Sequence, residues 1–275
     1  MSFRDRIGID IGRRMRLEDG IEWAAKHGVR HIDIQLDTAG NALTSFDDKR
    51  AAGVRAAIEK HGIHLGLHTN SATNVAEFAP YVSDAMDQYL RGYVDIYPKL
   101  GATWIVVHGG YHFTKDRQLR IDTAIERLKR IVAYAEKKGA RLLLENHNKE
   151  PETAEIHYVP FTLEEFVYYD QRIQSPNFRL SFTVNHAHLV PEGVAGFCDA
   201  LDFSRVGEVR LADCIRLGHE VHLVPGQGDL DFVDMFRRVE AKGYKGHYMN
   251  AFGEMKDMLA ARDYLEAQAK KAGVA

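Results

Sequence analysis

The chain has 275 residues, of which 45% are hydrophobic and 27% charged, with a formal net charge of −3 at pH 7. These values are ordinary for one large globular domain, and the slightly acidic charge argues against binding to nucleic acid. With two cysteines, a charged N-terminus and no apolar run near the roughly 18 residues that cross a membrane, we expect a cytoplasmic protein without membrane contact.

Eight short strand-like segments recur along the chain, separated by longer stretches with helical periodicity. They cover 6–12, 30–37, 63–70, 103–110, 141–148, 179–188, 207–214 and 246–252. Five of the helical stretches end in a lysine close to a glycine, at Gly28, Gly62, Gly101, Gly139 and Gly243. Glycine accepts the left-handed backbone that ends a helix, and lysine complements the helix dipole there. Eight such units predict a single (β/α)8 TIM barrel over residues 1–275.

Apolar and polar residues alternate within the predicted strands, and successive side chains of a strand point to opposite faces. The apolar row must face the helices, so the polar row points into the barrel, which is normally filled with branched apolar residues. We interpret Asp10 and Asp33 as core polar groups. Near the C-terminal strand ends, the polar row contains His68, His108, Glu145, Asn185 and Arg210. Because unpaired buried charges are costly, this row favours a functional pocket over a purely structural polar core.

Four stretches resemble motifs of the xylose isomerase-like TIM-barrel superfamily, which includes sugar isomerases and epimerases, inosose and dehydroshikimate dehydratases, and endonuclease IV. They are LLLENHN (142–148), TVNHAHL (183–189), VRLADC (209–214) and VPGQGDLDF (224–232). The resemblance covers essentially the whole chain. It implies an enzyme that acts on a small carbohydrate-like molecule. Family members are often dimers or tetramers, so a homo-oligomer is an alternative that the sequence leaves open.

The resemblance also implies a divalent-metal site, but several of its ligands are replaced. Glu145 matches the first ligand, whereas Asn185 and Arg210 stand where the family has Asp and His. The last ligand falls on Ala251, or on Asn250 in a neighbouring register. Because arginine is always protonated and has no free lone pair, it cannot bind a metal. We therefore expect no cofactor, with the Arg210 guanidinium in the metal's place and paired with Glu145.

A rival interpretation keeps a metal at a shifted site. Manganese, magnesium, zinc or cobalt would then bind through Glu145 together with His188, His147 or Asp213. These residue types supply the carboxylate and imidazole ligands that such ions prefer.

The resemblance assigns further roles at the same pocket. His188 matches the family histidine that touches substrate or moves a proton, and His147 matches a position used by dehydroshikimate dehydratases. Together with Glu145 and Arg210, they are our predicted catalytic residues. The predicted substrate-binding residues are Arg216, His68, His108, Asn185 and Asp213.

Histidine can both take and give a proton near neutral pH, and a fixed cation can stabilise an enediolate. We expect proton abstraction next to a carbonyl, leading to isomerisation, epimerisation or β-elimination. The alternative is a non-catalytic carbohydrate-binding or regulatory protein on a decayed enzyme scaffold. An endonuclease IV-like role is disfavoured, because that chemistry needs a metal cluster and a basic surface.

Overall fold

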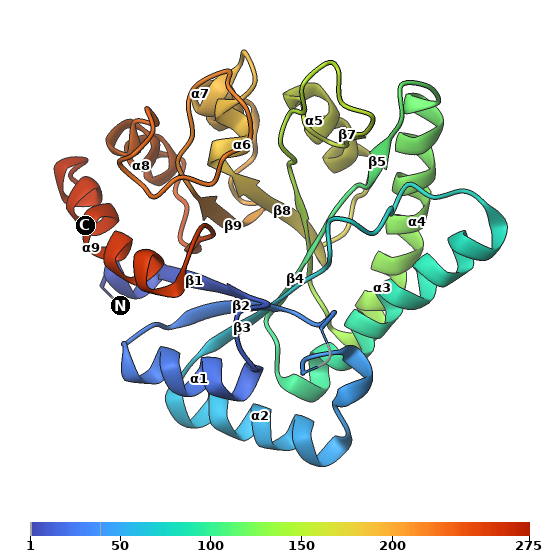
Figure 1. The fold of residues 1–275 in the computed structure, drawn as a ribbon, viewed down its shortest axis with the longest axis horizontal. Coiled ribbons are helices and arrows are strands. Elements are labelled where there is room, and N and C mark those ends of the chain that lie inside the picture. Colours follow the sequence, from blue (N-terminus) through green and yellow to red (C-terminus); the bar gives the residue numbers. More distant parts are fainter. Residues whose placement is uncertain (1, 39) are drawn as a thin grey trace.

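The protein forms a closed barrel of eight parallel strands surrounded by helices (Figure 1). The computed structural model describes residues 2–38 and 40–275. Around the barrel the strands follow the order β1-β10-β9-β8-β6-β4-β3-β2, so strands that follow one another in the chain are neighbours, and β10 pairs with β1 to close the ring. The predicted single (β/α)8 TIM barrel is confirmed.

Each predicted strand segment overlaps one barrel strand. The strands are β1 (Ile7–Gly12), β2 (His31–Gln35), β3 (His64–His68), β4 (Trp104–Val107), β6 (Leu142–Glu145), β8 (Phe178–Thr183), β9 (Val206–Leu211) and β10 (His247–Asn250). The segment expected to run from 179 to 188 ends at Thr183, where the chain turns directly into a short helix. This early end changes the direction of the side chains that follow it.

The helices lie outside the barrel and cover the apolar row of the strands. They are α1 (Leu17–Lys26), α2 (Asp48–His61), α3 (Pro80–Leu100), α4 (Arg117–Lys138), α5 (Leu163–Arg172), α6 (Val184–His188), α7 (Gly193–Ala200), α8 (Phe232–Ala241) and α9 (Met255–Lys271). All five glycines predicted as helix stops have a positive φ, as in Gly62 at 61° and Gly243 at 78°. In the part of the chain that the structure describes, no helix has the length and apolar character needed to span a membrane.

A small antiparallel two-stranded sheet extends two of the loops that follow the barrel strands. Its strands, β5 (Tyr111–His112) and β7 (His157–Tyr158), pair with each other and not with the barrel. β5 follows β4 and β7 follows β6, so this small sheet lies at the C-terminal end of the barrel (Figure 1). It forms part of the rim around the barrel mouth.

The barrel interior holds an apolar layer between two polar ends. Trp104, Val106, Leu143 and Met249 pack together inside the strands, separate from the main core between barrel and helices. Gly66 on β3 makes room for the largest of them, because a Cβ atom added at Gly66 would lie 2.2 Å from the Trp104 ring.

Replacement of Gly66 by alanine tests this packing. We expect Gly66→Ala to lower the free energy of unfolding by about 1–3 kcal/mol, because the indole must move within a filled barrel. Gly53→Ala is the matched control, since Gly53 lies on helix α2 with open space around it and should gain about 0.5–1 kcal/mol. Urea denaturation of both variants measures the difference. Equal effects of the two substitutions would contradict the packing.

Candidate active site at the barrel mouth

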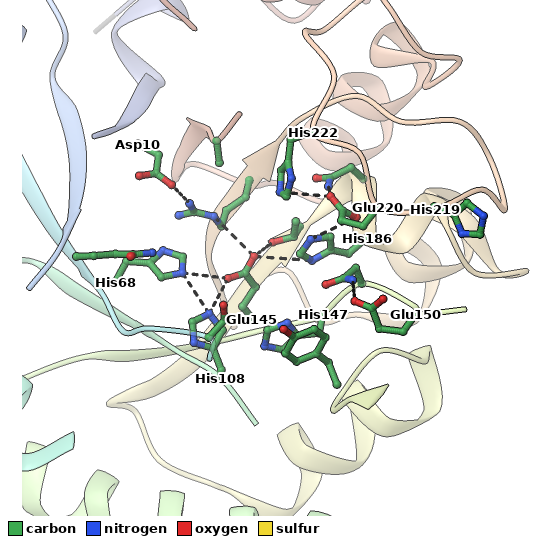
Figure 2. Close-up of a pocket in the computed structure, with 18 of the residues that line it drawn as sticks. Asp10, His68, His108, Glu145, His147, Glu150, His186, His219, Glu220 and His222 are labelled. Carbon is green, nitrogen blue, oxygen red and sulfur yellow. Dashed lines mark hydrogen bonds and ion pairs between the residues drawn. The ribbon is translucent and has the colours of Figure 1, made fainter. Parts of the chain in front are cut away.

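A cavity of about 550 Å³ opens at the C-terminal ends of the strands. Figure 2 shows that side chains from several strands and loops converge on it. Of the predicted site residues, the cavity is lined by His68, His108, Glu145, His147, Asn185 and Arg210. The barrel thus brings together polar side chains that lie far apart in the sequence.

Arg210 lies on the floor of the cavity, where its guanidinium is surrounded by carboxylates. Nη1 donates to Asp33 at 2.5 Å and to Glu208 at 3.2 Å, and Nη2 donates to Asp10 at 2.7 Å. The Nε atom is 3.8 Å from Glu145. The expected pair of Arg210 with Glu145 is thus present as an ion pair at 3.8 Å, but three other carboxylates are closer to the guanidinium. The fork of the guanidinium points across the barrel toward β1 and β2, so Asp10 and Asp33 bind it more closely.

The floor has more carboxylates than one arginine can neutralise, and their pKa values reflect this. Burial raises the pKa of Asp10 to about 7, with repulsion from Asp33 adding to the effect and Arg210 opposing it. Burial also favours the protonated form of Glu145, but the hydrogen bond from His108 and the charge of Arg210 outweigh it. They hold the pKa of Glu145 well below its usual value, so this carboxylate is ionised.

Glu145 meets two histidines in the geometry of a metal site. Its Oε2 atom is 3.3 Å from His108 Nε2 and 3.5 Å from His68 Nε2, and the two Nε2 atoms are 3.2 Å apart. A tetrahedral metal with bonds of about 2.1 Å separates its ligands by about 3.4 Å. The other ring nitrogens face Asp33 at 3.4 Å and Thr69 at 3.1 Å, which orients both rings. A divalent ion such as zinc therefore fits His68, His108 and Glu145.

The residues at the positions that the family resemblance assigns to metal ligands do not fit a metal. Arg210 brings a cation there, and Asn185 donates its Nδ2 to Glu220 at 2.9 Å. Ala251 lines the cavity and offers no ligand atom. In the neighbouring register, Asn250 is fully buried and donates to the carbonyl of Met258 on α9. The site suited to a metal is thus shifted toward β3 and β4.

His147 and His186 also line the cavity, and the His147 ring lies beside that of His108, with ring centroids 4.8 Å apart (Figure 2). The His147 ring stacks on Tyr158 of β7, with ring centroids 4.6 Å apart, and among the described residues its Nε2 atom has no hydrogen-bond partner. Burial and the neighbouring His108 keep the pKa of His147 well below its usual value. His186 Nδ1 donates to the carbonyl of Asn146 at 2.7 Å, and its ring lies 6.3 Å from that of His147.

His188 and Arg216 do not reach this cavity. They line a separate, smaller pocket beside α7 and α8, where His188 Nε2 is 2.9 Å from Asp229 and Arg216 donates to the carbonyl of Pro191. The expectation that both face the barrel mouth is wrong. Because β8 ends at Thr183 and helix α6 begins at once, His186 faces the cavity in place of His188.

Asp213 is also absent from the cavity wall, because its carboxylate holds a loop. The side chain is fully buried and accepts hydrogen bonds from four backbone N–H groups at 2.8–3.2 Å, those of Cys214, Gly226, Gly228 and Leu230. These residues belong to the loop that carries the P-G-x-G motif. Asp213 has no oxygen left for a substrate or a metal, so its predicted binding role is corrected to a structural one.

Sequence reasoning missed one side of the cavity. Glu220 and His222 come from the loop after β9, and Gln35 ends β2. Glu220 accepts from Asn185, and its two carboxylate oxygens lie 3.3 Å from His222 and 3.7 Å from His186. The E-x-H spacing in this loop is the signal that could have identified them, because it places a carboxylate and an imidazole side by side.

The comparisons with known proteins agree with this architecture. The family description of xylose isomerase-like TIM barrels matches residues 21–268. The chain belongs to this family. No curated protein matches the sequence.

Solved structures similar to this member of the family include three sugar epimerases or epimerase-like proteins. A D-tagatose 3-epimerase-like protein is 20% identical with a TM-score of 0.82, covering 97% of this chain and 98% of that one. D-psicose 3-epimerase from Clostridium cellulolyticum H10, solved with D-tagatose, is 17% identical with a TM-score of 0.80, covering 97% of this chain and 98% of that one. A 3-keto-D-glucoside 4-epimerase from E. coli is 16% identical with a TM-score of 0.73, covering 96% of this chain and 99% of that one. At these identities the likeness shows a shared fold.

The structural role of Asp213 can be tested by mutation. We expect Asp213→Ala to lower the free energy of unfolding by about 3 kcal/mol or more, because it leaves buried N–H groups without an acceptor. Asp231→Ala is the control, since Asp231 is exposed and accepts one backbone N–H at the start of α8; it should cost about 1 kcal/mol. Chemical denaturation checks both values, and an Asp213→Ala protein as stable as wild type would refute the role.

Proposed function

We propose that this protein is an enzyme that moves a proton at the carbon next to a carbonyl of a small polyhydroxylated compound. The observation that supports this most directly is the Nε2 atom of His147 on the cavity wall, which has no hydrogen-bond partner among the described residues and whose ring lies beside His108 of the Glu145 cluster. A buried imidazole without a partner is available to take a proton from a bound molecule. His186, whose ring centroid is 6.3 Å from that of His147, is the candidate for returning the proton.

The polar atoms of the cavity support a hydroxylated substrate. Among the described residues, Asp10 Oδ1, Gln35 Oε1 and Glu220 Oε2 are buried acceptors without a hydrogen-bond donor. A buried acceptor that lacks a partner is destabilising, and hydroxyl groups of a ligand can satisfy it. Because these three atoms come from three different parts of the rim, they suit a molecule with several hydroxyls, such as a keto-sugar, a cyclitol or a related acid.

The side chains around the reacting carbon favour histidine chemistry over a pair of carboxylates. Glu145 supplies one carboxylate, but Ala251 lines the cavity where the resemblance calls for the second. A symmetric exchange between two carboxylates is therefore disfavoured. Two imidazoles can carry an isomerisation or an epimerisation, and one of them can protonate the leaving oxygen in a β-elimination. Arg210 keeps a fixed positive charge on the floor, with its Nε atom toward Glu145.

The family resemblance implies a divalent metal, and the residues that would hold it are His68, His108 and Glu145. When bound, such an ion polarises a carbonyl oxygen. The floor carries four carboxylates around one guanidinium, so an additional cation would reduce the excess negative charge. This arrangement favours a metal held by Glu145 over a site without metal, but with His68 and His108 in place of the His188, His147 or Asp213 that the alternative named.

The replaced family ligands also support a second candidate, a carbohydrate-binding protein without activity. A library of ketoses, aldoses and keto-acids, scored first by thermal shift and then by turnover, separates the two functions. Binding without turnover of any bound compound would favour the second candidate.

We expect His147→Gln to lower kcat/KM by about 10²–10⁴-fold, because it removes a group that moves a proton. The melting temperature should stay within a few degrees, since the His147 Nε2 atom makes no hydrogen bond to residues 2–38 or 40–275 that the substitution would break. His188→Gln is the matched control and should leave turnover within about threefold. The result that would contradict the assignment is a larger loss in His188→Gln than in His147→Gln.

The metal assignment is tested by zinc binding to protein purified without chelators. We expect one equivalent of zinc per chain in wild type, weakened by at least about 100-fold in Glu145→Gln and in His108→Gln. Asn185→Ala, at the family position, should retain the zinc. Retention of zinc by Glu145→Gln, or its loss in Asn185→Ala, would place the ion elsewhere.

A further inference from the structure

A second cavity, of about 380 Å³, lies at the opposite end of the barrel, where the strands begin. Four rings stand around it. His31, His64, Trp104 and His247 are the first residues of β2, β3, β4 and β10. The same end layer of the barrel is therefore built from aromatic side chains, whereas barrel layers are usually filled with branched apolar residues.

The four rings form a continuous wall. His31 stacks on His247 with centroids 4.8 Å apart and on His64 at the same distance, and Trp104 lies 4.2 Å from His247. Gly8 makes room for this wall, because a Cβ atom there would lie 2.7 Å from the Cβ of His31. His31, Trp104 and His247 are each more than nine-tenths buried. Because His64 and His247 cover the two faces of His31, with interplanar angles of 19° and 7°, the stacked imidazoles leave ring edges for a ligand, and a planar group can pack edge-to-face against them.

The polar groups of this cavity are mainly cations and donors. Arg6, Arg141 and Lys245 line it, and its described lining residues include no carboxylate. Arg6 is paired with Glu240 at 2.8 Å, whereas Arg141 and Lys245 form no ion pair within residues 2–38 and 40–275. Trp104 Nε1 is a buried donor that also lacks a partner in the described chain. The indole Nε1 lies against Gly66 in the apolar layer, so the groups that a ligand with several acceptor oxygens would satisfy are Arg141 and Lys245.

The nearest buried carboxylate does not cancel this charge. Glu208 accepts hydrogen bonds from His247 Nε2 at 2.9 Å, from Ser181 at 2.8 Å and from Arg210 at 3.2 Å. Helix C-termini at this end also attract basic residues, which accounts for lysines at the helix stops. It does not account for four aromatic rings that line one cavity.

We propose that this cavity binds a small organic phosphate, with the phosphate between Arg141 and Lys245 and a planar group against the ring wall. Arginine and lysine are the usual partners of phosphate oxygens, and the cavity volume lies in the range of small-molecule sites. The proposal concerns a site at the far end of the barrel from the mouth and does not depend on the reaction proposed there.

Trp104 provides a local signal for the test. The chain has two tryptophans, and Trp23 lies on helix α1, so Trp23→Phe leaves Trp104 as the sole reporter. Phenyl phosphate, inorganic phosphate and phenol are titrated at constant ionic strength. We expect a saturable change in emission with phenyl phosphate, about tenfold weaker binding of inorganic phosphate, and no saturation with phenol. Absence of a saturable change with phenyl phosphate would overturn the proposal.

Charge-matched variants show whether binding is local. Arg141→Gln/Lys245→Gln should weaken binding of phenyl phosphate by at least about tenfold. Arg237→Gln/Lys256→Gln removes the same charge from exposed positions outside the cavity and should leave binding unchanged. Equal weakening in both pairs would show a nonspecific charge effect and overturn the site. Calorimetry on the chain with both tryptophans gives the same comparison if Trp23→Phe does not fold.

Discussion

The ion network around Arg210 is the constraint on which the barrel interior depends. One guanidinium binds Asp10 of β1, Asp33 of β2 and Glu208 of its own strand, and so joins opposite sides of the barrel. Each of these charges would be costly alone in a dry interior, and removal of one partner leaves the others uncompensated. The strands can hold this polar row inside the barrel because the charges of the network neutralise and hydrogen-bond one another.

The same network separates two cavities of opposite chemical character. Arg210 contacts the mouth through Asp10 and Glu145, and it contacts the far end through Glu208 and His247. At the mouth, unpaired groups are mainly acceptors and acids, whereas at the far end they are donors and cations. A barrel with an apolar interior would hold neither arrangement. The polar core therefore supports a hydroxylated ligand at one end and an anion at the other.

Much of the fold could be predicted from the sequence, because alternation and helix stops are local signals. The eight strands, the helix-ending glycines and the inward direction of the polar row all follow from spacing. The partners within that row could not be predicted. Arg210 binds Asp33 and Asp10, which lie 177 and 200 positions away, and the choice among four carboxylates depends on the direction of its fork.

The predictions for His188, Arg216 and Asp213 were wrong because the local backbone points these side chains away from the direction that the family motifs imply. His188 and Arg216 were assigned by spacing from family motifs, but the early start of α6 turns His188 toward Asp229. Asp213 was assigned by its position after β9, and the sequence does not show that four backbone N–H groups donate to its carboxylate. His186 and Glu220 lie near these motifs in sequence, yet their direction depends on a helix and a loop.

Proton abstraction next to a carbonyl can be measured without knowledge of the product. Candidate keto-sugars are incubated with the protein in deuterated water, and NMR follows the loss of the signal from hydrogens beside the carbonyl. We predict that at least one compound exchanges such a hydrogen for deuterium at a rate proportional to protein concentration, even where no net conversion occurs. Tight binding of a keto-sugar at the barrel mouth with no exchange above the protein-free rate would contradict it.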